Sequence, residues 1–135
     1  MTALFMLDTD TCAFILRGAP PTLEQRLGSV PMRQQVMSVV TYAELLFGVR
    51  VSSRRKSNRA AVDAMVRNLQ VLDWTSSAAE HYADIRFALR TGGAMIGAND
   101  LMIAAHARSL DATVVTNNLR DFRRIRGLSV ENWLD

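Results

Sequence analysis

The amino-acid sequence predicts an α/β fold, with a mainly parallel sheet covered by helices on both faces. Short apolar runs alternate along the chain with segments of helical periodicity, and parallel neighbours require crossover connections that are usually helical. The 135 residues are 49% hydrophobic and 21% charged, which provides enough apolar surface for one globular domain. We therefore expect a single domain over residues 1–135.

Five short apolar runs are the candidate strands. Continuous apolar runs of this kind are typical of strands that are buried on both faces of a sheet. They lie at residues 4–7, 36–40, 71–73, 113–115 and 128–130.

Periodicity and capping signals place helices between these strands. Apolar residues between Val62 and Leu69 recur at the spacing of one helical face, Ser77 and Glu80 form a capping-box pair, and Gly92 is a stop signal. The expected helices cover about residues 11–17, 22–27, 41–50, 58–70, 77–91 and 98–110.

Composition excludes several classes of protein. The only cysteine is Cys12, so no disulfide can form within one chain, and a reducing, cytoplasmic location is expected. We find no apolar stretch near the roughly 18 residues that a membrane span needs, and no signal-peptide pattern. The sequence therefore favours a protein that neither enters a membrane nor is exported.

The chain is basic, with a net charge of +3 and a pI near 9.7. A charge of this size is only a weak indication of a polyanionic partner. Its distribution is more informative, because one segment concentrates five basic residues: Arg50, Arg54, Arg55, Lys56 and Arg59. This segment is either a solvated face or a contact surface for RNA phosphates.

Polar side chains follow several of the predicted strands. In open α/β sheets, ligands bind outside the carboxyl ends of the strands. Each acid also has an ordinary explanation as a helix cap or a first-turn carboxylate, and Thr41 and Glu44 have the spacing of a capping box. The candidate site residues are Asp8, Thr9 and Asp10 after the first strand, Glu44 after the second, Asp100 at a helix start, and Thr116, Asn118 and Asp121 after the fourth.

Several carboxylates around one crevice would repel one another unless a cation lay between them. Mg²⁺ or Mn²⁺ is the cation that best suits carboxylates, hydroxyls and water. Such an ion polarises a phosphoryl group and lowers the pKa of a bound water that can attack it. The pattern therefore predicts metal-dependent nuclease chemistry, with arginines holding phosphates further out.

Five motifs resemble those of VapC-type toxins, the PIN-domain ribonucleases of type II toxin–antitoxin modules. They are "MLDTDTC", "TYAELLFGV", "IGANDLMIAAHA", "VTNNLRDF" and "GLSVENW", in this order and over nearly the whole chain. The resemblance implies a PIN domain with four or five parallel strands flanked by helices. It also implies Mg²⁺- or Mn²⁺-dependent endonucleolytic cleavage of structured RNA, often tRNA. The implied partners are a cognate VapB-type antitoxin and a second copy of the chain.

Carried over by position, the resemblance makes Asp8, Glu44 and Asp100 the metal-binding acids. Two positions depart from the family pattern. Many PIN domains have an aspartate where this chain has Asn118, and Asp121 is a candidate to supply that charge directly or through water. Asp10 stands where asparagine is more common, and it either compensates for Asn118 or caps a helix.

Two other functions remain open at the level of sequence. Asp8 and Asp10 of the "DTD" segment also resemble the nucleophile-plus-acid pair of haloacid-dehalogenase-type phosphatases. That family expects a lysine and a further pair of acids downstream, but the only lysine is Lys56 and no adjacent acids follow. The other alternative is a catalytically silent PIN module that binds RNA or a protein partner, with Asn118 as the sign of lost activity.

Overall fold

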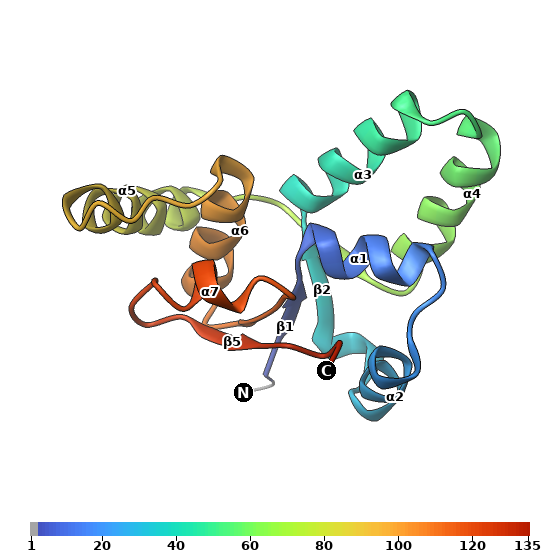
Figure 1. Ribbon diagram of the computed structural model, residues 1–135, viewed down its shortest axis with the longest axis horizontal. Helices are drawn as coiled ribbons and strands as arrows, with labels where there is room; N and C mark the ends of the chain where they lie inside the picture. Colours follow the sequence, from blue (N-terminus) through green and yellow to red (C-terminus); the bar gives the residue numbers. More distant parts are fainter. Residues whose placement is uncertain (1–2) are drawn as a thin grey trace.

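The computed structural model describes residues 3–135, and its central feature is a sheet of five parallel strands (Figure 1). The order across the sheet is β3-β2-β1-β4-β5, and every neighbouring pair is parallel. The strands are β1 (Phe5–Leu7), β2 (Gln35–Ser38), β3 (Gln70–Leu72), β4 (Thr113–Val115) and β5 (Ser129–Glu131). The predicted α/β fold with a parallel sheet is confirmed.

Helices cover both faces of the sheet. They are α1 (Thr9–Leu16), α2 (Pro21–Ser29), α3 (Val39–Val51), α4 (Arg55–Val66), α5 (Ser76–Thr91), α6 (Ala98–Ser109) and the short α7 (Leu119–Phe122), with a single 3-10 turn at Met32–Gln34. In Figure 1, α5, α6 and α7 lie on one side of the sheet, and α1, α3 and α4 lie on the other.

Alternate residues of the strands divide the core into two layers. Met6 of β1 belongs to the layer that includes Ile85 of α5 and Leu101 of α6. Its neighbour Leu7 belongs to the layer that includes Leu45 of α3 and Val62 of α4. Because successive strand side chains point to opposite faces, a three-residue strand is enough to hold both helix layers on the sheet.

Several helix starts differ from those expected. Helix α1 begins at Thr9 rather than near residue 11, because Asp8 is its N-cap. Helix α3 begins at Val39 rather than near Thr41, because Ser38 is its N-cap and accepts a hydrogen bond from the Val40 N–H at 3.1 Å. Helix α4 begins at Arg55 rather than near residue 58. Helix α5 is capped by the Thr75 hydroxyl instead of starting at a capping box on Ser77.

The strand order places the switch point of the sheet beside β1. The chain passes from β1 to β2 and β3 on one side, and it returns to β4 on the other side. In doubly wound sheets, this reversal opens a crevice at the carboxyl ends of the strands.

None of the helices within residues 3–135 combines the length and the apolar character needed to cross a bilayer.

Candidate active site

Asp8 lies at the carboxyl end of β1, where the strand turns directly into α1. Its backbone N–H donates to the Val115 carbonyl at 3.0 Å, which joins the end of β1 to the end of β4. Its Oδ1 accepts the Thr11 N–H at 2.9 Å, so Asp8 is the N-cap of α1. The Thr116 hydroxyl, which follows β4, is a further hydrogen-bond partner of the carboxylate. Asp8 is 2% exposed and is fixed by both strands.

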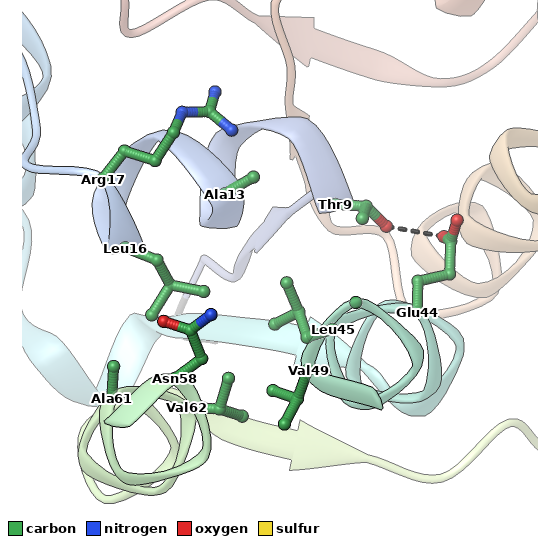
Figure 2. Close-up of a pocket in the computed structure, with 11 residues that line it drawn as sticks. Thr9, Ala13, Leu16, Arg17, Glu44, Leu45, Val49, Asn58, Ala61 and Val62 are labelled. Atoms are coloured by element: carbon green, nitrogen blue, oxygen red, sulfur yellow. Dashed lines mark hydrogen bonds between the residues drawn. The ribbon is translucent and has the colours of Figure 1, made fainter. Parts of the chain in front are cut away.

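Glu44 reaches the same end of the sheet from α3. The Thr9 hydroxyl donates to Glu44 Oε1 at 2.7 Å, and Thr9 Oγ1 lies 3.3 Å from Oγ1 of the buried Thr41. Figure 2 shows Thr9 and Glu44 facing each other across the gap between α1 and α3. Since Glu44 is beyond the first turn of α3, it cannot form the capping box that its spacing from Thr41 suggested.

Asp100 and Asp121 meet through an asparagine. Asn118 Nδ2 lies 3.1 Å from Asp121 Oδ2 and 3.4 Å from Asp100 Oδ2. Asp100 is in the first turn of α6 and Asp121 is in α7, where it also pairs with Arg124 at 3.4 Å. The amide of Asn118 thus occupies the space between two carboxylates and donates to both.

The carboxylates lie close enough to change one another's protonation. Burial is the largest effect, and it raises the pKa of Asp8 despite the hydrogen bonds from Thr116 and Thr11. Burial, the negative charge of Asp8 and the smaller effects of Asp10 and Glu44 together raise the pKa of Asp100 to about 6, although the Asn118 hydrogen bond opposes the shift. Asp8, Asp10, Glu44 and Asp100 therefore belong to one electrostatic neighbourhood.

The expected cage of three carboxylates around one point is not present in this conformation. Within the described part of the chain, no three aspartate, glutamate, histidine or cysteine side chains are arranged to hold one metal ion together. Each carboxylate instead has a separate hydrogen-bond donor, namely Thr11 and Thr116 for Asp8, Thr9 for Glu44 and Asn118 for Asp100. Mutual repulsion favours this separation, because close unpaired carboxylates cost several kcal/mol.

The basic segment lies apart from these acids. Arg50 lies in the last turn of α3, Arg54 precedes α4, and Lys56 lies in the first turn of α4, which contains no acidic residue. Arg59 lies further along α4 and pairs with Asp63 at 3.0 Å. The side chains are exposed, and Arg55 Nε donates to the Arg50 carbonyl at 2.9 Å, which closes the turn between the helices. We call this surface, made of Arg50, Arg54, Arg55, Lys56 and Arg59, the basic tip.

One polar residue of the site was assigned only a capping role from the sequence. Thr41 is fully buried and contacts Thr9, which places it behind the Thr9–Glu44 hydrogen bond. The available signal was the buried strand just before it, which brings the start of α3 to the same sheet edge as Asp8. The sequence could not reveal the contact itself, because it joins residues 32 positions apart.

The fold and this site agree with a match to a known domain family. The family model for the PIN domain matches residues 6–128. The chain therefore belongs to the PIN-domain family, as its motifs indicated.

Relatives and solved structures define the branch of the family. The tRNA(fMet)-specific endonuclease VapC of Salmonella typhimurium is 40% identical over 129 residues, which cover 96% of this chain and 97% of that protein. Ribonuclease VapC2 of Rickettsia felis is 34% identical over 131 residues, covering 96% and 98%. DNA-bound VapBC from Salmonella typhimurium superposes with a TM-score of 0.93 at 39% identity, covering 98% of this chain and 99% of that chain. Within the PIN domains, the chain is a VapC toxin ribonuclease. The haloacid-dehalogenase-type alternative is not supported.

Proposed function

We propose that this VapC ribonuclease uses Mg²⁺ or Mn²⁺ to cleave phosphodiester bonds in structured RNA, with tRNA as the substrate class. The observation that carries the proposal is the group of acids Asp8, Glu44 and Asp100 at the switch point of the sheet, where burial and nearby negative charge raise the pKa of Asp8 and of Asp100. Two of the similar proteins are tRNA(fMet)-specific endonucleases, which supports tRNA over other structured RNAs as the substrate.

The donor chemistry of the site fits a hard divalent cation. Mg²⁺ is usually bound by one or two carboxylates and keeps several waters, so acids that lie near one another without forming a closed cage suit it. Asp8, Asp100 and Glu44 would hold the ion directly or through its bound waters, and when bound it would polarise the phosphoryl group and activate water. A bound cation would also remove the repulsion that raises the pKa of Asp8 and Asp100.

The other polar residues hold these acids in place or adjust their charge. Thr9 orients Glu44, Thr116 donates to Asp8, and Asn118 separates Asp100 from Asp121. Many PIN domains have an aspartate at the position of Asn118. In this chain Asp121 supplies that negative charge instead, either held by the Asn118 amide or acting through water. Asp10 is exposed at the mouth of the site and adds negative charge there.

The basic tip binds the RNA backbone outside the catalytic acids. The tip lies at the end of the α3–α4 hairpin, which extends away from the sheet in Figure 1, and its five basic residues are exposed. Arginine and lysine contacts to phosphates position a nucleic acid without reading its sequence. The tip can therefore hold a structured RNA while one of its bonds enters the acidic site.

A VapB-type antitoxin binds the apolar cavity beside Glu44. This cavity of about 320 Å³ lies between α1, α3 and α4, and Leu16, Leu45, Val49 and Val62 line it (Figure 2). An amphipathic partner helix recognises a groove of this kind through its apolar face. The similar structures from Salmonella typhimurium and Rickettsia felis are VapBC complexes bound to DNA, which supports this partner and a toxin–antitoxin hetero-oligomer.

A second copy of the chain binds the opposite flank of α3. Phe47 and Val51 project from this helix with 68% of each residue exposed. Phe47 also lines an apolar cavity of about 770 Å³, together with Val40 and Trp74. Exposed apolar surface of this extent is typical of a protein interface, so we assign it to a homodimer.

The test measures RNA cleavage by the purified protein, in a buffer of cytoplasmic pH and ionic strength that contains Mg²⁺ or Mn²⁺. Asp8→Asn keeps an oxygen that can cap α1 but removes the charge, so we expect cleavage of tRNA to fall at least about 100-fold with the fold intact. Asp111→Asn is the matched control, because Asp111 has φ 53°, a conformation that asparagine also tolerates. Chelation should abolish cleavage. A wild-type chain that binds tRNA without cutting it would instead support the silent binding module.

A further inference from the structure

A buried hydrogen bond joins the two helices that carry Glu44 and Asp100. His106 Nδ1 of α6 lies 2.8 Å from the Oγ of Ser38, the N-cap of α3. His106 is 1% exposed and Ser38 is 0% exposed. The contact spans 68 positions of sequence and lies outside the catalytic acids.

The Ser38 hydroxyl takes part in two hydrogen bonds, one as acceptor and one as donor. Its Oγ accepts the Val40 N–H at 3.1 Å, so the hydroxyl can donate its proton to His106 Nδ1. Burial lowers the pKa of His106, which keeps the ring neutral and able to accept. The ring also hydrogen-bonds to the backbone of Asp73, just after β3, and the Asp73 carboxylate is the charged group that acts on it.

Each member of this pair is six residues from an acid of the site. Glu44 follows Ser38 by six positions in α3, and Asp100 precedes His106 by six positions in α6. At 1.5 Å per residue this separation is about 9 Å, so a tilt of about 6° at the contact moves the acid by about 1 Å.

The position of the Asp100 carboxylate depends on the direction of α6, because few hydrogen bonds hold its side chain. Its contact with Asn118 is 3.4 Å long, and Gly97 at the N-cap of α6 offers no side-chain hydrogen bond. Glu44 is better supported, through Thr9. Misplacement of a reacting group by about 1 Å can cost about 100-fold in rate.

We propose that the Ser38–His106 hydrogen bond fixes the separation between Glu44 and Asp100, which makes His106 a positioning residue for the nuclease reaction. The inference rests on the proposed metal-dependent function. It gives His106 a role that does not require contact with RNA, metal or the scissile bond.

The test compares substitutions at His106 in the full chain. His106→Leu removes the acceptor, and we expect it to lower kcat for tRNA cleavage about 10- to 100-fold, with KM within about twofold of wild type. It should also weaken Mn²⁺ binding, measured by the electron paramagnetic resonance of free Mn²⁺. His106→Asn keeps a polar atom near the Nδ1 position and should restore most of both properties.

His81→Leu is the matched control. His81 accepts from Arg108 Nε at 2.8 Å on the α5 side of α6, and no hydrogen bond joins it to the described residues of α3. This variant should leave kcat and Mn²⁺ affinity unchanged. Thermal unfolding of every variant separates a loss of positioning from a loss of fold, and Ser38→Ala provides a second removal of the same bond.

The proposal is overturned if folded His106→Leu retains wild-type kcat and Mn²⁺ affinity, or if His106→Asn is as impaired as His106→Leu. A wild-type chain that binds Mn²⁺ but cuts no RNA would overturn the proposed function alone. The Mn²⁺ affinities of the variants would then still decide whether His106 positions the acids.

Discussion

Asp8 shows that a structural and a functional interpretation of one residue can both hold. The sequence left open whether this acid caps a helix or belongs to a site. In the structure it caps α1 through Thr11 and lies in the same electrostatic neighbourhood as Asp100. The two properties are linked, because a cap at the carboxyl end of β1 necessarily lies at the switch point of the sheet.

Asp100 should make the metal-free protein less stable as pH rises. Its pKa is about 6 in the folded state against 3.8 in the unfolded chain, so folding favours the protonated form. The stability that this proton provides is present below pH 4 and is lost as pH rises through 6. Asp100→Asn should therefore raise the melting temperature at pH 7.5 by a few degrees, equivalent to about 1 kcal/mol for a partly buried group that water still screens.

The measurement is thermal unfolding with a chelator present, at pH 7.5 and pH 4. The two proteins should converge at the lower pH, where Asp100 is protonated in wild type. Added Mg²⁺ should stabilise wild type more than Asp100→Asn, because a ligand that binds only the folded state adds to its stability. Equal melting temperatures of wild type and Asp100→Asn at pH 7.5 would show that burial and the neighbouring charges do not destabilise ionised Asp100.

At the scale of the helices, sequence patterns found each long element but misjudged where several begin. Val39 and Val40 have side chains that favour strands, so the second strand was expected to continue through them. The Ser38 cap and the turn toward the site override that preference, and both valines enter α3. The missed contacts of Ser38 and Thr41 follow from this shift, because their partners are 68 and 32 residues away.

The basic tip of the α3–α4 hairpin should govern RNA affinity without affecting the chemical step. Lys56→Glu reverses a charge in the first turn of α4, where it also opposes the helix dipole less than lysine does. We expect KM for tRNA to rise about 3- to 10-fold with kcat unchanged, and the salt dependence of binding to weaken by about one counterion. Arg90→Glu, at an exposed position of α5, is the matched control. Equal effects of both substitutions would indicate only a loss of net charge.

The cavity between α1, α3 and α4 should admit an antitoxin helix only if the side chains at its edge are small. Ala61 lines this cavity from α4, whereas the adjacent exposed Ala60 does not. Ala61→Arg should weaken binding of the cognate antitoxin at least about 10-fold in calorimetry, because a long cation would fill an apolar groove. Ala60→Arg should bind normally. Tight binding by Ala61→Arg would place the antitoxin elsewhere.

At the scale of the whole molecule, alternation of strands and helices was enough to predict the class of fold. It did not give the strand order, because the positions of β4 and β5 depend on which edge of β1 remains free after β2 pairs with it. The group of acids was predictable because each follows a strand or begins a helix. Their separation was not, because it depends on side-chain donors such as Asn118 and Thr9 from other elements.

The last prediction concerns the assembly of two chains. Phe47 is 68% exposed on α3, and it lies on the opposite flank of that helix from the cavity assigned to the antitoxin. Phe47→Asp would place a charge in the centre of the proposed homodimer interface, and an unpaired buried charge costs several kcal/mol. Sedimentation equilibrium should therefore give about 30 kDa for wild type, twice the 15.0 kDa chain mass, and 15.0 kDa for Phe47→Asp. Met32→Asp, at an exposed methionine outside this flank, should remain a dimer. A wild-type monomer, or a dimer that survives Phe47→Asp, would rule out this surface as the homodimer interface.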